Sequence, residues 1–163
     1  MATIAGFYHV GIAAHDPLTL AEFYRDVLGM TITGGSEEGS QLGKTAFLSS
    51  RPEDENHELA IFANSAYRHL AFKVDALVDL RALHRQVVER GIPIKRTVNH
   101  GCSFAFYFDD PEGNMIEIYW PTGLQNRQPY GDPLDFAASD ADLLRQTAAI
   151  TDRAGLPLPP TLV

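Results

Sequence analysis

Three residues of the chain have the side chains that bind a divalent metal ion, and two of them recur at a fixed spacing. His9 and His69 are 60 residues apart, and each opens a short apolar segment, HVGI and HLAF. Glu117 stands between two isoleucines in NMIEIYW, where a carboxylate without a cation would be costly to bury. Two imidazoles and one carboxylate form the facial triad that holds non-haem Fe(II) with open coordination positions. Mn(II), Zn(II) and Ni(II) accept the same ligands.

The two histidines belong to an internal repeat. Residues 9–29 and 69–91 share one order of features: His, apolar strand, Asp, amphipathic helix, Gly. In the first copy, Asp16 is expected to cap the helix and Gly29 to end it. The apolar stripe expected on this helix consists of Leu20, Phe23, Tyr24, Val27 and Leu28. Short apolar segments around it predict strands at 7–13, 30–33, 45–48 and 59–63.

The second copy predicts the same order, with a helix over about 77–90. Its strands are expected at 69–74, 93–97, 103–108 and 115–120. The predicted fold class is therefore α+β, with two βαβββ repeats that form one module with a curved mixed sheet. The module is expected over residues 1–122, in halves of about 5–64 and 66–122. Residues 123–163 are interpreted as a C-terminal arm with a helix near 138–150, which could act as a lid over the site.

Composition and charge exclude several classes of partner. The chain has 163 residues, with 21 acidic against 13 basic side chains and a net charge of -8, which disfavours nucleic acid and anionic membranes. No apolar run approaches the roughly 18 residues of a membrane span, and the N-terminus has no signal-peptide pattern, so a cytoplasmic location is expected. The single cysteine, Cys102, excludes an internal disulfide and is expected to be a packed small residue.

The metal-ligand segments resemble a known family. His9-Val-Gly-Ile, His69-Leu-Ala-Phe and Asp110-Pro-Glu-Gly-Asn-Met-Ile-Glu117 are similar to the metal signature of the vicinal oxygen chelate superfamily. This superfamily includes glyoxalase I, bleomycin and fosfomycin resistance proteins, methylmalonyl-CoA epimerase and type I extradiol dioxygenases. The resemblance covers about residues 5–122, and it implies the fold, the metal ligands and a homodimer.

Three further residues resemble the extradiol dioxygenase branch. His57 stands in NHELAIF, on the strand before the second ligand, His100 stands in NHGCS, and Tyr107 lies ten residues before Glu117. The resemblance implies that Fe(II) binds both oxygens of a catechol-like aromatic diol, which O2 then cleaves. His57 would donate a proton during cleavage of the O–O bond, while Tyr107 and His100 would hydrogen-bond the ionised substrate oxygen.

Two alternatives remain open from the sequence. Glyoxalase I-like members take a fourth ligand near Glu58, and such an enzyme would use Zn(II) or Ni(II). Neighbouring residues of a regular strand point to opposite faces, so His57 and Glu58 should not both face the metal unless the strand bulges. His57 is favoured, because His100 and Tyr107 have no obvious role in a glyoxalase. A metal-free binding protein of the bleomycin resistance type would leave the His, His, Glu set unexplained.

Overall fold

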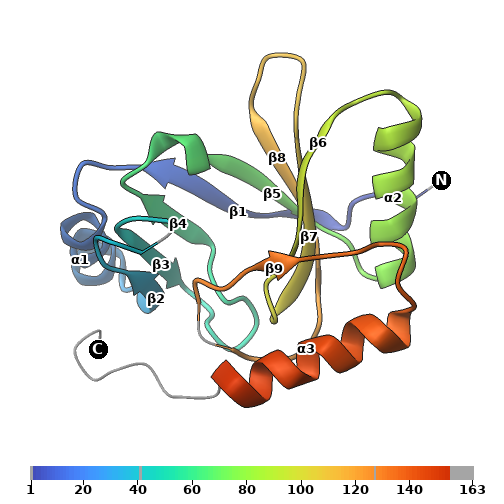
Figure 1. Ribbon diagram of the computed structural model, residues 1–163. Helices are drawn as coiled ribbons and strands as arrows, with labels where there is room; N and C mark the ends of the chain where they lie inside the picture. The colour runs from blue at the N-terminus through green and yellow to red at the C-terminus, as the bar shows by residue number, and fades with distance from the viewer. Residues whose placement is uncertain (1, 41, 127, 155–163) are drawn as a thin grey trace. The chain divides into compact units, whose positions relative to one another are not determined.

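The computed structural model describes residues 2–40, 42–126 and 128–154 (Figure 1). These residues fall into two compact units. The N-terminal unit comprises residues 9–69, and the C-terminal unit comprises residues 2–8 and 70–154. Each unit carries one copy of the repeat that the sequence shows.

The N-terminal unit contains a four-stranded mixed sheet with one helix. Its strands have the order β2-β3-β4-β1. Strand β1 pairs parallel with β4, whereas β3 pairs antiparallel with both β2 and β4. The elements are β1 (Gly6–Ala13), α1 (Pro17–Leu28), β2 (Thr31–Ser36), β3 (Thr45–Ser49), β4 (Leu59–Phe62) and the single turn η1 (Ser65–Tyr67).

Helix α1 begins and ends where the sequence predicts. The side chain of Asp16 accepts hydrogen bonds from the backbone N–H groups of Leu18 and Thr19, and Gly29 ends the helix with a left-handed φ of 71°. The expected apolar stripe is only partly correct. Leu20 and Tyr24 pack on the core, but the side chains of Phe23, Val27 and Leu28 are exposed. Helical spacing identifies an apolar face without showing how wide a face the sheet covers.

The C-terminal unit contains the strands β5-β8-β7-β6-β9, in this order. Strand β5 pairs parallel with β8, and the remaining pairs are antiparallel. The elements are β5 (His69–Lys73), α2 (Leu77–Glu89), β6 (Ile94–Asn99), β7 (Ser103–Asp109), β8 (Met115–Pro121), β9 (Asp132–Pro133) and α3 (Asp140–Ala154). His69, the first residue of β5, belongs to the N-terminal unit.

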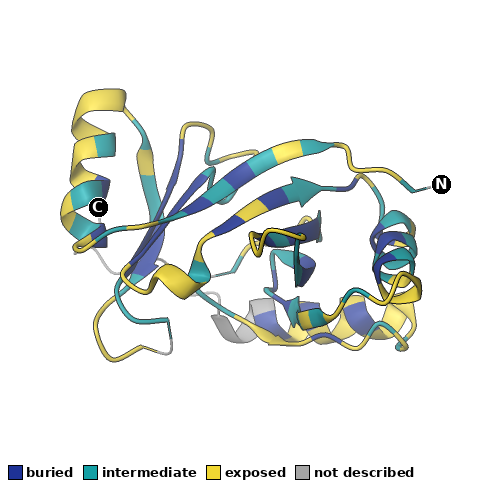
Figure 2. Ribbon diagram, turned by 90° about the horizontal axis from the view of Figure 1, so that it is seen from above, coloured by how far each residue is buried: buried dark blue, intermediate teal, exposed yellow. Residues whose placement is uncertain are grey.

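One face of these strands packs on helix α2. Leu80 and Leu83 of the helix contact Phe104, Phe106 and Ile118 of the strands in one buried cluster. Each such side chain contributes about 1.5–3 kcal/mol when fully buried. In Figure 2 most buried positions lie on the strands, and most exposed positions lie on loops and helices. The residues that alternate with these side chains, among them Ala105 and Tyr107, form a separate buried cluster.

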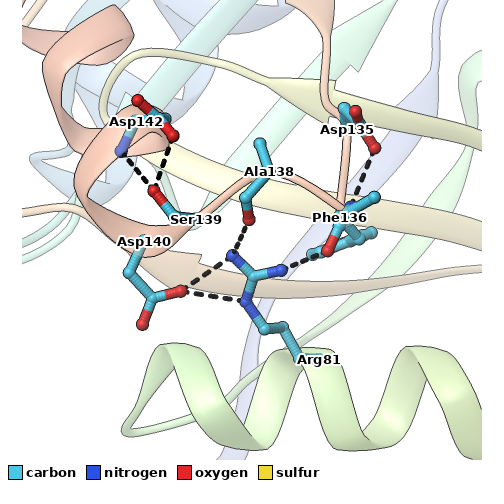
Figure 3. Close-up of polar contacts among 8 residues, drawn as sticks. Arg81, Asp135, Phe136, Ala138, Ser139, Asp140 and Asp142 are labelled. Atoms are coloured by element: carbon cyan, nitrogen blue, oxygen red, sulfur yellow. Dashed lines mark hydrogen bonds and ion pairs between the residues drawn. The ribbon is translucent and has the colours of Figure 1, made fainter.

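The C-terminal arm is an integral part of its unit. Residues 132–133 form the edge strand β9, where only a helix further along the arm was predicted, and Leu134 and Leu143 join the buried cluster. Arg81 of α2 donates hydrogen bonds to the backbone carbonyls of Phe136 and Ala138 and to the carboxylate of Asp140 (Figure 3). The lid role of the arm stays a prediction, and residues 155–163 lie outside the described part of the chain.

The α+β class and both βαβββ repeats expected from the sequence are confirmed. Strands β2 and β6 extend further than expected, to Ser36 and Asn99, and helix α3 runs to Ala154 rather than to residue 150. No helix in the described ranges is both long and apolar enough to cross a membrane.

Candidate metal centre and its polar surroundings

The two repeated histidines lie side by side in the N-terminal unit. The Nε2 atoms of His9, on β1, and His69, at the start of β5, are 3.1 Å apart, and both residues are buried. Their rings meet edge to face, with an interplanar angle of 88°. The pairing predicted from their 60-residue spacing is thus present in the folded chain.

A backbone carbonyl fixes the proton on the ring of His69. The Nδ1 atom lies 2.7 Å from the carbonyl oxygen of Tyr67, in the turn η1 directly before β5. Because a carbonyl oxygen only accepts, Nδ1 carries the hydrogen, and in the neutral ring Nε2 presents its lone pair. Metal-binding histidines commonly donate their other ring N–H to a carbonyl in this way.

The distance between the two Nε2 atoms fits two neighbouring ligands of one ion. With metal–nitrogen bonds of about 2.1 Å, ligands at right angles lie about 3.0 Å apart, and ligands at a tetrahedral angle about 3.4 Å apart. The observed 3.1 Å lies in this range, and in the metal-free chain it also fits a hydrogen bond between the two rings.

Gly11 provides the space for the ring of His69. A Cβ atom built on Gly11 would lie 2.5 Å from Nδ1 and 2.7 Å from Cε1 of His69. Because glycine has no side chain, residue 11 lets the imidazole of His69 lie close to strand β1. The sequence analysis did not assign this role to Gly11.

Glu117 lies on β8 in the C-terminal unit, where it is 4% exposed. Its partner in the parallel register is Ala71 of β5. Glu117 and Ala71 therefore lie on the same face of these two paired strands. By residue type and burial, His9 and His69 of the N-terminal unit and Glu117 of the C-terminal unit are the candidate metal ligands in the described ranges.

His57 lies against the ring of His9 in the N-terminal unit. Its half-buried imidazole is stacked on Phe47 and lies 4.4 Å from the His9 ring, measured between centroids. Its Nδ1 atom is 3.1 Å from Oδ1 of Asn56. His57 therefore meets the histidine pair, as the resemblance implies.

Glu58 is directed to other partners. Its carboxylate accepts hydrogen bonds from the backbone N–H and the hydroxyl of Ser50, at 2.7 and 2.5 Å, and from Nε of Arg51 at 3.0 Å. The hydrogen bond from the Ser50 hydroxyl is the main cause that lowers the pKa of this carboxyl. Strand β4 begins only at Leu59, so strict alternation does not apply to residues 57 and 58.

Strand register gives a second argument about a fourth ligand. Glu117 pairs with Ala71, and Ala60 pairs with Gly11, which is the counterpart of Ala71 in the first repeat. The position equivalent to Glu117 is therefore Ala60, which has no ligating atom. The geometry gives no support to Glu58 as a metal ligand.

His100 and Tyr107 form a hydrogen-bonded pair in the C-terminal unit. Nε2 of His100, in the turn between β6 and β7, lies 2.9 Å from the hydroxyl of Tyr107. Tyr107 stands directly opposite Glu117 in the antiparallel register of β7 and β8. The seven-residue spacing between His100 and Tyr107 is thus short enough for the two side chains to meet.

Burial and a neighbouring charge keep the Tyr107 hydroxyl protonated. Tyr107 is 3% exposed, and its burial raises the pKa of its hydroxyl well above 10.0. The negative charge of Glu117 adds to this increase, and the guanidinium of Arg96, 4.1 Å from the ring centroid, partly offsets it. Tyr107 is therefore a neutral hydrogen-bond donor near neutral pH.

Sequence reasoning missed the residues that hold His100. They are Asn126, Gln128 and the carbonyl of Tyr130, in a stretch that was interpreted as loop. The composition of PTGLQNRQPYGDP indicates turns but not their partners, because a backbone carbonyl at residue 100 leaves no signal in the sequence.

The chain belongs to the Glyoxalase/Bleomycin resistance protein/Dioxygenase superfamily, whose model matches residues 6–118. This is the vicinal oxygen chelate family whose metal signature the sequence resembles. The family prediction is therefore confirmed.

Individual relatives differ in the reactions that their names describe. The chain is 28% identical over 111 residues to biphenyl-2,3-diol 1,2-dioxygenase 3 of Rhodococcus globerulus, a match of 61% of this chain and 54% of that protein. It is 29% identical over 112 residues to glutathione transferase FosA of Serratia marcescens, covering 68% and 77% of the two chains. A crystal structure of catechol 2,3-dioxygenase superposes with a TM-score of 0.60 and 25% identity, over 80% of this chain and 45% of that one. The chain thus spans about half the length of the dioxygenases that it matches.

Proposed function

We propose that the protein is an Fe(II)-dependent extradiol dioxygenase that cleaves a catechol-like aromatic diol with O2. The observation that carries the proposal is the placement of His57 against His9, while Glu58 is bonded to Ser50 and Arg51. A proton donor thus stands beside the histidine pair, where a glyoxalase would need a carboxylate. The similarity to the biphenyl-diol dioxygenase supports the same reaction class.

The metal ligands in this proposal are His9, His69 and Glu117. Two neutral imidazoles and one carboxylate suit Fe(II), with Mn(II) as an alternative ion. When bound, the metal would hold both oxygens of the diol and supply the redox chemistry toward O2. The Tyr67 carbonyl keeps the Nε2 lone pair of His69 available for this role, and Gly11 leaves room for the ring.

The remaining side chains of the proposed site handle protons and orient the substrate. Tyr107 stays protonated, and its hydroxyl has a single hydrogen. When the diol binds, this hydrogen turns from Nε2 of His100 to an ionised diol oxygen and stabilises that charge. Nε2 of His100 forms a hydrogen bond with the Tyr107 hydroxyl, so the protonation of this ring atom decides in which direction the hydroxyl hydrogen points. His57 is the proton donor for the oxygen that leaves when the O–O bond breaks.

The similarity to FosA favours a second candidate, a metal-dependent enzyme that uses glutathione. The corresponding prediction from the sequence is a glyoxalase I-like lyase or isomerase that binds Zn(II) or Ni(II) with Glu58 as the fourth ligand. The hydrogen bonds of the Glu58 carboxylate with Ser50 and Arg51 argue against this ligand. A metal-free binding protein of the bleomycin resistance type remains the third reading.

The test is reconstitution of the full chain with Fe(II) without oxygen, followed by a panel of catechols in air. We expect oxygen uptake and a yellow semialdehyde, visible as new absorbance. His57→Ala should keep its iron and lose turnover, whereas Glu58→Gln should keep both. Turnover of methylglyoxal and glutathione with Zn(II) or Ni(II), or binding of no metal at all, would refute the proposal in favour of the second or third reading.

A homodimer is also expected from the family resemblance. Size-exclusion chromatography with light scattering measures the mass of the particle directly, and a mass equal to one chain would refute this expectation.

A further inference from the structure

The C-terminal arm contacts His100 at both its backbone and its ring. The backbone carbonyl of His100 accepts hydrogen bonds from Nδ2 of Asn126, at 2.9 Å, and from Nε2 of Gln128, at 2.7 Å. The ring atom Nδ1 lies 2.6 Å from the carbonyl oxygen of Tyr130. Three residues of one short segment therefore determine where this histidine lies.

Gln128 links the two ends of this arrangement. Its Oε1 accepts from the backbone N–H of Tyr130 at 3.1 Å, while its Nε2 donates to the carbonyl of His100. The side chain is buried, with only 6% of the residue exposed. The side-chain amide of Gln128 thus holds the backbone of His100. It also holds Tyr130, whose carbonyl accepts the hydrogen bond from the His100 ring.

These contacts place the proton of the imidazole. The Tyr130 carbonyl can only accept, so Nδ1 of His100 must carry a hydrogen. In the neutral ring, Nε2 then presents its lone pair to the hydroxyl of Tyr107. In water the neutral imidazole of histidine favours the opposite tautomer, with its proton on Nε2, so the arm has to impose the one seen here.

The arm is itself anchored on both sides of this segment. Thr122 donates to the carbonyl of Gly101, and Asn99 donates to the buried hydroxyl of Thr147 in α3. Gly101 has a φ of +78°, and a Cβ there would lie 2.5 Å from the side chain of Asn126. Further along, the Arg81 hydrogen bonds in Figure 3 hold residues 136–140 against α2. Hydrogen bonds therefore hold the chain on both sides of Asn126, Gln128 and Tyr130.

We propose that Gln128 is a positioning residue that keeps the proton of His100 on Nδ1 and its Nε2 on the Tyr107 hydroxyl. Asn126 and the Tyr130 carbonyl act with it. This segment lies beyond residues 6–118, which match the family model, so the arrangement is a feature of this chain's arm. Its catalytic consequence rests on the proposed function, whereas the tautomer itself does not.

The tautomer is measured by long-range ¹H–¹⁵N NMR spectra of the metal-free full chain labelled with ¹⁵N-histidine, at a pH where the imidazoles are neutral. His100→Gln identifies the signals of His100. We expect a protonated Nδ1 and an unprotonated Nε2 in the wild type, and a shift toward protonated Nε2 in Gln128→Ala. Gln146→Ala makes the same change at an exposed position of α3 and should leave the His100 signals unchanged.

A protonated Nε2 in the neutral wild-type ring would overturn the proposal, and this measurement does not depend on the folding of Gln128→Ala. Unchanged His100 signals in a folded Gln128→Ala would overturn the role of Gln128. In the iron-loaded protein, Gln128→Ala should lower kcat by about 10- to 100-fold without loss of iron, and should shift the pH profile. If no diol is turned over but the tautomer is as expected, the proposed function fails and the positioning role stands.

Discussion

Replacing Gly11 by alanine should displace the imidazole of His69 and weaken metal binding. The new Cβ would lie 2.5 Å from Nδ1 of His69 and 3.1 Å from Cε2 of Phe62. Ordinary contact requires about 3.5 Å, so the His69 ring has to move by roughly 1 Å. Gly11 does not have a positive φ, so the effect comes from the contact and not from backbone strain.

The size of the effect follows from how narrowly metal bonds tolerate displacement. Ligand distances hold within about 0.2 Å, so a shift of roughly 1 Å breaks the geometry between His69 and its partner His9. It also stretches the 2.7 Å hydrogen bond from His69 to the Tyr67 carbonyl. We expect the dissociation constant for Fe(II) to rise by about 10- to 100-fold. The overpacking should also lower the free energy of unfolding by about 1–3 kcal/mol.

The assay is competition with a chelating dye under anaerobic conditions, first with Fe(II) and then with Mn(II). Gly6→Ala is the matched control, because it lies on the same strand and its Cβ would meet only the flexible ring of Tyr8, at 3.3 Å. Thermal melts establish that both variants fold. A folded Gly11→Ala that binds the ions as tightly as the wild type would refute the reasoning about His69.

Three further predictions address neighbouring features. Glu58→Gln should keep metal affinity, and lost metal binding would contradict this. The stability that the lowered pKa of Glu58 contributes is fully present above pH 4.5 and is lost as the pH falls through the lowered value, so wild type and variant should converge in stability below pH 4.5. Above pH 10.0 the Tyr107 hydroxyl of the unfolded chain loses its proton before that of the folded chain, which lowers the free energy of unfolding, so Tyr107→Phe should reduce this loss. Urea titrations in which the free energy of unfolding of both proteins falls equally with alkaline pH would contradict this. Arg81→Lys should lower the free energy of unfolding by about 1–2 kcal/mol and speed hydrogen exchange in α3, and unchanged exchange would argue against the anchor.

Two of the three metal-ligand candidates could be predicted because the repeat preserved them. His9 and His69 occupy equivalent positions of two strands, and an internal period of 60 residues is visible without any structure. Glu117 has no counterpart in the first repeat, and it was chosen because its carboxylate stands between two apolar residues of a predicted strand. The roles of these three residues as ligands stay a prediction until a metal is measured.

The polar surroundings were less predictable, because they depend on turns. The turn at Gly101, with its positive φ, is what brings His100 back over β7 to Tyr107, and a spacing of seven residues does not determine such a path. The prediction that Phe23 and Val27 belong to the buried face of α1 was also wrong because it depends on tertiary packing. Phe23 and Val27 have the right period, but only tertiary packing decides how far a sheet reaches across a helix.

The two repeats agree in their histidines and differ at the positions that define the chemistry. Each sheet has a register shift in its first antiparallel pair, after which Phe47 faces Gly34 in one unit and Tyr107 faces Arg96 in the other. Phe47 supports the ring of His57, whereas its counterpart Tyr107 is a hydrogen-bond donor next to a carboxylate. Comparing the sequences of the two repeats identifies residues that are the same in both, such as the histidines. It does not identify equivalent positions at which the side chains differ. The residues that distinguish one reaction from another in this fold are therefore found by comparing registers, which identify equivalent positions even when the side chains differ.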